Sequence, residues 1–256
     1  MNRILNMICL LVLTSLPFFA QTENPVADFI AKGDEAYARY DNAAALEHYQ
    51  NAFRADSANY EAAWKLSRAY VDVGEVQEKK ETRRTYYQEA DNYARKAVEI
   101  DYLGAKGHLW RSIALGRVAL DAGAKERVQM SKEIKKEVDR ALELDPTDDI
   151  AWHVLGRWHR KIATLSWVEK RFANMFLGGV PKEASVQKAA ECFQKAIELH
   201  PEHLNHYLEL GLTYEELKQK EPAIAQYQKV LELPVADADD EGFKATARER
   251  LEKLKK

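Results

Sequence analysis

The sequence predicts an all-α protein in which about five helical hairpins stack into a right-handed α-solenoid. The composition is the first observation behind this prediction: 31% of the 256 residues are charged, 46% are hydrophobic, and Gly and Pro are few, which is typical of long solvated helices. The second is a repeated spacing, in which an aromatic residue is followed three and four positions later by Leu and Gly, at Trp152, Leu155, Gly156 and at Tyr207, Leu210, Gly211. A fixed spacing of this kind indicates repeated structural units.

The second half of each predicted repeat also has a fixed pattern. A small residue is followed four positions later by an aromatic one, at Ala45 and Tyr49, Ala189 and Phe193, and Ala223 and Tyr227. Together the two half-patterns resemble the tetratricopeptide (TPR) repeat, a pair of antiparallel helices that approach closely at small residues. Because each hairpin leaves an apolar face for the next one, the last needs a polar cover. We expect residues 240–256 to form this capping helix.

The predicted repeats are longer in the middle of the chain than at its end. The small residue near the end of each second helix lies at Ala52, Ala97, Ala141, Ala196 and Val230. The steps between these positions are 45, 44, 55 and 34 residues, and only the last equals the TPR period of about 34. The middle repeats are therefore predicted to contain lengthened helices or an additional element.

Residues 162–177 form the centre of the largest excess. Gly178 and Gly179, followed by Pro181, predict a helix that ends at Leu177. Its apolar side chains form one stripe, at Val168, Phe172, Met175 and Phe176. We expect this stripe to pack on the lengthened hairpins as additional core. The alternative is that it lines a pocket or contacts a membrane surface.

The first twenty residues differ from the rest of the chain. Asn2 and Arg3 precede an apolar run over residues 4–16, and Ala20 offers a cleavage position. This pattern predicts a signal peptide at 1–20 and a mature TPR-like domain at 21–256, exported to the periplasm or secreted. The alternative is a retained N-terminal membrane anchor. After cleavage Cys192 is the single cysteine, so no internal disulfide is expected.

One stretch of the chain is similar to a narrower family. The run Leu155, Gly156, Arg157 and Trp158, with Leu165, Ser166, Trp167, Val168, Glu169 and Lys170 after it, resembles the eukaryotic regulator of microtubule dynamics family over residues 105–234. The resemblance implies a TPR-like binding domain with stretched hairpins and no catalytic residues. Members of the family are connected with microtubules and organelle membranes. Because an exported protein would not meet cytosolic tubulin, we carry over the fold and the binding role alone.

Motifs for catalysis and cofactor binding are missing from the sequence. It contains no glycine-rich phosphate loop, no His-Glu-x-x-His helix and no Gly-x-Ser-x-Gly elbow. The best metal candidate is the series His200, His203 and His206, which are three residues apart. Pro201 interrupts it and places His200 at the end of one helix and the other two at the start of the next. We therefore expect solvated turn residues, and we predict no catalytic, cofactor or metal site.

The chain is expected to bind another molecule rather than to catalyse a reaction. In a TPR unit the first helix lines the concave face, and this register places six polar side chains there: Arg68, Arg111, His153, Arg157, Arg160 and Lys161. Guanidinium groups favour carboxylates and phosphates. The hypothesis is therefore a groove with a basic centre that binds a protein or peptide, acidic in character. The alternative is that these are ordinary solvated charges.

A rival hypothesis is lipid or another small hydrophobic or anionic ligand, bound between helices or at a membrane surface. Apolar contact would then come from Trp158, Trp167, Phe172, Met175 and Phe176. The formal net charge is −3, which provides no overall attraction for nucleic acid.

Overall fold

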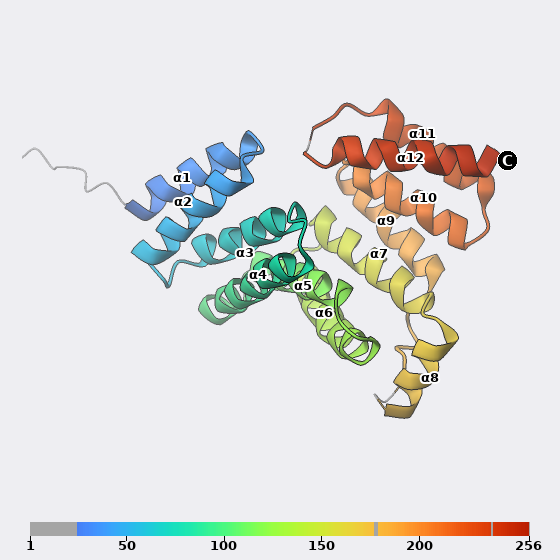
Figure 1. Cartoon of the computed structure of the whole chain (residues 1–256), viewed down its shortest axis with the longest axis horizontal. Coiled ribbons are helices and arrows are strands. Elements are labelled where there is room, and N and C mark those ends of the chain that lie inside the picture. The colour runs from blue at the N-terminus through green and yellow to red at the C-terminus, as the bar shows by residue number, and fades with distance from the viewer. Residues whose placement is uncertain (1–24, 177–178, 237, 256) are drawn as a thin grey trace, which may run out of the picture.

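The computed structural model describes residues 25–176, 179–236 and 238–255. All regular secondary structure in these ranges is helical (Figure 1). The helices are α1 (Pro25–Ala38), α2 (Asn42–Ala55), α3 (Tyr60–Glu75), α4 (Lys80–Ile100), α5 (Ala105–Leu120), α6 (Ala124–Leu144), α7 (Asp149–Ala163), α8 (Trp167–Phe176), α9 (Val186–Leu199), α10 (Leu204–Glu216), α11 (Lys220–Glu232) and α12 (Asp240–Lys255).

The helices pair into five hairpins that follow one another along an arc (Figure 1). Hairpins 1, 2 and 3 are α1/α2, α3/α4 and α5/α6, hairpin 4 is α7/α9, and hairpin 5 is α10/α11. Each second helix also packs on the first helix of the next hairpin, and α12 covers hairpin 5. The predicted all-α solenoid of five hairpins with a C-terminal capping helix is confirmed.

A glycine that faces an aromatic ring holds the two helices of a hairpin together. This contact occurs in four hairpins, between Gly33 and Tyr49, between Gly74 and Tyr87, between Gly156 and Phe193, and between Gly211 and Tyr227. A Cβ atom at Gly211 would lie 2.5 Å from Cε1 of Tyr227, a distance too short for any side chain. All four rings are buried, and those of Tyr49, Phe193 and Tyr227 completely so, because the missing Cβ lets each ring fill the space between the helices.

The extra length of the middle repeats has two structural forms. In hairpins 2 and 3 the second helices α4 and α6 each reach 21 residues. In hairpin 4 the excess is the separate helix α8, which lies between α7 and α9 and packs on α6. Both forms that the repeat spacing predicts, lengthened helices and an additional element, are therefore present.

The sequence predicted that the segment 162–177 is helical as far as Leu177. The structure instead divides it, because a capping box starts a new helix inside it. The side chain of Ser166 accepts a hydrogen bond from the Glu169 backbone N–H at 3.3 Å. The Glu169 carboxylate accepts from the Ser166 backbone N–H at 2.9 Å. These reciprocal bonds satisfy the free N–H groups of a helix start, so α7 ends at Ala163 and α8 begins at Trp167.

Two of the expectations concern parts of the chain outside the described residues. The predicted signal peptide at 1–20 and Leu177, the expected end of the inserted helix, fall there. The side chain of Phe176 also lies outside the described part. None of the helices in the described ranges combines the length and the apolar composition needed to span a bilayer.

Candidate functional site

The concave side of the solenoid contains a cavity of about 530 Å³. Its walls come mainly from the first helices α3, α5 and α7, with contributions from α6 and α12. Trp110, Ile113, Val154, Trp158 and Ile162 form its apolar surface. Trp158 is buried and donates from its indole N–H to the Ser131 carbonyl at 2.7 Å, which fixes this wall of the cavity.

The charges along the cavity are balanced. Four acidic and four basic side chains line it, namely Asp72, Glu75, Glu169 and Asp239, and Arg117, Arg127, Arg157 and Lys161. Arg117 forms an ion pair with Glu75. Burial raises the pKa of Glu75 more than Arg117 lowers it, and the charge of Asp239 adds to the increase. The groove is therefore mixed in charge, which differs from the basic centre that the sequence predicted.

The predicted groove arginines are engaged by acidic or aromatic partners. Arg160 forms an ion pair with Glu209, and both side chains are buried. Arg157 approaches the same carboxylate at 3.5 Å. Arg111 donates to the buried Glu137 at 2.5 Å. The repeat register used for the prediction concerns the first helices alone, whereas Glu137 and Glu209 reach the arginines from inside the helix interfaces.

The other predicted groove residues either pack between hairpins or line the cavity. Arg68 stacks on the Tyr37 ring, 3.7 Å from its centroid, and donates to the Tyr49 hydroxyl at 2.9 Å, so it joins hairpins 1 and 2. His153, Arg157 and Lys161 line the cavity. Of these, Lys161 is exposed and His153 is buried.

Helix α8 leaves most of its apolar stripe exposed. Trp167 is 69% exposed, Val168 67% and Met175 60%, whereas Phe172 is half-buried and Ala173 fully buried. The expected packing of the stripe as additional core is therefore wrong for Val168 and Met175. The physical reason is that the short helix turns the side with Ala173 inward. A role of the exposed side in ligand or membrane contact stays a prediction.

Hairpins 4 and 5 meet at a cluster of histidines that the sequence argument did not predict. His206 is completely buried, and its Nδ1 lies 2.9 Å from Nδ1 of His153. The His203 ring stacks on the His206 ring with centroids 4.2 Å apart. The expectation of solvated turn residues is thus wrong for His206 and fits only His200, whose side chain is 51% exposed.

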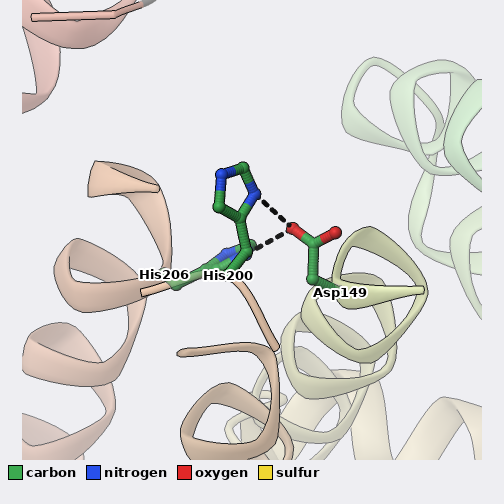
Figure 2. Close-up of side chains that lie close together, drawn as sticks. All are labelled: Asp149, His200 and His206. Carbon is green, nitrogen blue, oxygen red and sulfur yellow. Dashed lines mark hydrogen bonds and ion pairs between the residues drawn. The ribbon is translucent and has the colours of Figure 1, made fainter. Parts of the chain in front are cut away.

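A carboxylate from α7 completes the cluster. Oδ2 of Asp149 lies 2.9 Å from Nε2 of His206 and 3.2 Å from Nδ1 of His200 (Figure 2). Burial would raise the pKa of Asp149, but the bonds and charges of His206 and His200 outweigh it and lower the pKa to about 2. Asp149 is more than fifty positions away in sequence, so no local spacing could have shown this contact.

Comparison with known proteins assigns the chain to a family. Residues 29–255 match the family model described as Regulator of microtubule dynamics protein 1-3. The chain belongs to this family. The predicted resemblance is confirmed, and the match extends well beyond residues 105–234. It includes every residue of the cavity lining and of the histidine cluster.

Two relatives in this family illustrate the degree of similarity. Regulator of microtubule dynamics protein 3 of Rattus norvegicus is 32% identical over 181 residues, which cover 70% of this chain and 38% of the relative. Regulator of microtubule dynamics protein 1 of Homo sapiens is 29% identical over 190 residues, which cover 73% of this chain and 60% of the relative. The chain therefore spans less than two thirds of the length of each.

Solved structures support the TPR-like fold of this member of the family. A thermophilic TPR protein of Thermus thermophilus has a TM-score of 0.65 at 19% identity, covering 87% of this chain and 98% of its own. PilF of Pseudomonas aeruginosa has a TM-score of 0.55 at 16% identity, covering 90% and 91%. At these identities the likeness shows the fold alone.

Proposed function

We propose that the chain is a non-enzymatic scaffold that binds a peptide segment of a partner protein in its concave groove. The observation that carries this proposal is the cavity of about 530 Å³, whose walls include Trp110 and Trp158. An apolar pocket of this size accepts one or two large apolar side chains, and a few convergent polar groups fix the orientation of the ligand.

The charges around the cavity define the type of peptide. Because acidic and basic side chains are equally numerous there, neither a strongly acidic nor a strongly basic segment is favoured by the overall field. The lining has two exposed cations, Arg127 and Lys161. Arg127 forms an ion pair with Glu169, so Lys161 is the one that suits a single carboxylate next to the apolar anchor. The proposed ligand is therefore an apolar peptide with few charges, rather than the acidic peptide of the sequence hypothesis.

Gly116 offers a way to fill the groove without disturbing the fold. It lines the cavity, and a Cβ atom placed on it meets nothing within 4 Å. In Gly116→Leu the new side chain occupies space that the peptide needs. The matched control is Gly242→Leu, because Gly242 lies on α12, also has open space around it, and is exposed outside the lining.

Peptides selected from a random display library against the full chain provide the test. We expect Gly116→Leu to weaken the best of them at least tenfold, while Gly242→Leu changes the affinity less than twofold and neither variant lowers the thermal midpoint. Equal affinity in both variants would contradict binding in the groove. Native mass spectrometry of the purified chain tests the rival: a co-purifying lipid that Gly116→Leu removes would replace the peptide proposal.

Export is a separate proposal that rests on the composition of residues 1–20. Cleavage after Ala20 would leave Gln21 as the first residue, and intact-mass measurement of the exported protein tests this. Retention of Met1 in a membrane fraction would favour the anchor instead.

A further inference from the structure

Three potential metal ligands meet where hairpins 4 and 5 join. Asp149 is the first residue of α7, His200 is the C-cap of α9, and His206 lies in the first turn of α10. Their ligand atoms all lie within 4.8 Å of one another. Figure 2 shows both imidazoles turned toward the same oxygen of the Asp149 carboxylate. Three separate helices therefore present one ligand each to a common point.

Two of the three distances between the ligand atoms are close to those that a small divalent ion requires. Zn²⁺ binds imidazole nitrogen and carboxylate oxygen at about 2.0–2.2 Å with tetrahedral geometry, so two of its ligand atoms lie about 3.3 Å apart. The corresponding distances from Asp149 are 3.2 Å to His200 and 2.9 Å to His206. These two pairs need shifts of only a few tenths of an ångström to hold an ion. The third pair, the two imidazole nitrogens, lies within 4.8 Å, and the exposed side chain of His200 can move toward His206.

A second layer of side chains holds His206 in the orientation that a metal needs. When Nε2 of His206 binds an ion, its proton resides on Nδ1, which then donates to Nδ1 of His153 at 2.9 Å. His153 is buried on the inner side of this contact, and its Nδ1 can accept the bond when its own proton is on Nε2. Hydrogen bonds of this kind fix the tautomer and ring orientation of metal-binding histidines. The His203 ring stacks on the face of the His206 ring and supports the same orientation.

We propose that Asp149, His200 and His206 bind a divalent transition-metal ion of the Zn²⁺ type, which connects hairpins 4 and 5. Two imidazoles and one carboxylate are a common protein ligand set for Zn²⁺ and leave a fourth position for water or a partner's group. The ion replaces the hydrogen bonds that Asp149 accepts, and it ties the start of α7 to the start of α10. This inference does not depend on the ligand of the groove.

Metal titration of the full, untagged chain after chelator treatment tests the proposal. Co²⁺ is the spectroscopic probe, because nitrogen and oxygen ligands in low-symmetry coordination give it visible absorption. We expect one equivalent of Co²⁺ to bind, Zn²⁺ to displace it, and Zn²⁺ to raise the thermal midpoint by several degrees, since a ligand of the folded state stabilises it by mass action.

Two substitutions and a control assign the site. His200→Gln removes a ligand from an exposed position, and Asp149→Asn removes the charge; each should weaken Co²⁺ binding tenfold or more. His48→Gln is the matched control, because it makes the same substitution on α2, far along the chain, and should leave the affinity unchanged. Absence of one-to-one binding up to millimolar Co²⁺ would overturn the proposal, as would equal affinity in His200→Gln, Asp149→Asn and His48→Gln.

Discussion

Hairpins 4 and 5 are built around the same contact, but only hairpin 5 has the regular repeat length. In both, a glycine of the first helix receives an aromatic ring of the second, Gly156 with Phe193 and Gly211 with Tyr227. Hairpin 5 connects its helices by residues 217–219, whereas hairpin 4 inserts α8. The comparison teaches that the glycine–aromatic contact defines the hairpin, while the connection between the helices can vary.

The inside of each hairpin also differs from the interface between them. Inside hairpin 5 the contacts are mostly apolar and closely packed. Between hairpins 4 and 5 lie the buried pair Arg160–Glu209 and the bonds of His206 to His153 and Asp149. Buried charges are costly without a partner, so this interface forms only in the register that pairs all of them. An apolar cluster around Phe193 and Leu210 also crosses this interface. Apolar packing therefore holds the hairpins together, and polar pairing fixes the orientation of one hairpin on the next.

The largest expected effect comes from removing the charge of Glu209. Glu209→Gln leaves Arg160 buried without its counter-ion and takes a second carboxylate contact from Arg157. Loss of one member of a buried pair costs about 3–5 kcal/mol, which should appear as a large drop in the free energy of unfolding by urea. Glu143→Gln is the control, because Glu143 pairs with Arg140 on the surface, and exposed pairs contribute about 0–1 kcal/mol.

A double substitution separates pairing from general damage. In Arg160→Met with Glu209→Met both charges are absent, and much of the lost stability should return. If the double variant is less stable than Glu209→Gln, the register of the two hairpins does not depend on this pair.

The next effect compares the glycine contacts of the two hairpins directly. Gly211→Ala places a Cβ atom 2.5 Å from the Tyr227 ring, and Gly156→Ala places one 2.9 Å from the Phe193 ring. Overpacking costs about 1–3 kcal/mol, so Gly211→Ala should be the more destabilising. The Tyr227 hydroxyl is also bound to Glu215, which prevents the ring from moving away.

Gly116→Ala provides the control for both glycine variants. Gly116 lies within α5 and has open space around it, so alanine should stabilise the chain by about 0.5–1 kcal/mol through helix propensity. Differential scanning calorimetry of the three variants gives the order. Equal stability of all three would show that the rings adjust and that the contact does not define the hairpin.

A smaller effect, on the pH dependence of stability, is expected at a position where hairpin 4 has a histidine and hairpin 5 a tyrosine. Hairpin 4 has His159 where the repeat spacing places Tyr214 in hairpin 5. Burial, with the charges of Lys135 and Lys188, lowers the pKa of His159 to about 4. The folded pKa is below the unfolded value of about 6.5, so the unfolded state takes up the proton first and stability falls as the pH drops from 7 toward 4.

His159→Tyr makes hairpin 4 resemble hairpin 5 and removes this titration. After allowance for partial solvent screening, the contribution at pH 5 is about 1 kcal/mol, or roughly 2–4 °C in the midpoint. We expect the loss of thermal stability between pH 7 and pH 5 to be smaller in His159→Tyr by this amount. An unchanged pH response would show that His159 accepts its proton within the folded state.

The repeat pattern was sufficient to predict the fold, because it lies in residues close together in sequence. Leu-Gly after Trp152 or Tyr207 predicted the helix contacts, and the uneven repeat lengths predicted the long helices and the insertion. The start of α8 also has a local signal, the Ser166–Glu169 capping box, whereas the prediction for this segment uses the apolar stripe and the glycines after it. Local signals of this kind can be read without knowledge of the tertiary structure.

The site was harder to predict because its contacts connect distant parts of the chain. Glu209 is 49 positions from Arg160 and Asp149 is 57 positions from His206. Arg157 and Lys161, which the repeat register assigns to the groove, line the cavity. The register could not show that Arg160 forms an ion pair with Glu209, a carboxylate of the next hairpin. Which charged side chains are available for a ligand can therefore be decided only when the packing of neighbouring hairpins is known.

The smallest effect is expected on α8, the helix that distinguishes hairpin 4 from hairpin 5. Met175 is 60% exposed, whereas Ala173 on the same helix is fully buried. Met175→Asp should change the free energy of unfolding by no more than about 0.5 kcal/mol, as is usual at exposed positions. Ala173→Asp is the matched control, because it buries a charge without a partner and should cost at least about 2 kcal/mol. Urea unfolding of both variants decides whether the stripe is exposed or packed as core. If Met175→Asp destabilises as strongly as Ala173→Asp, then α8 packs as core and the insertion extends the hydrophobic interior of hairpin 4.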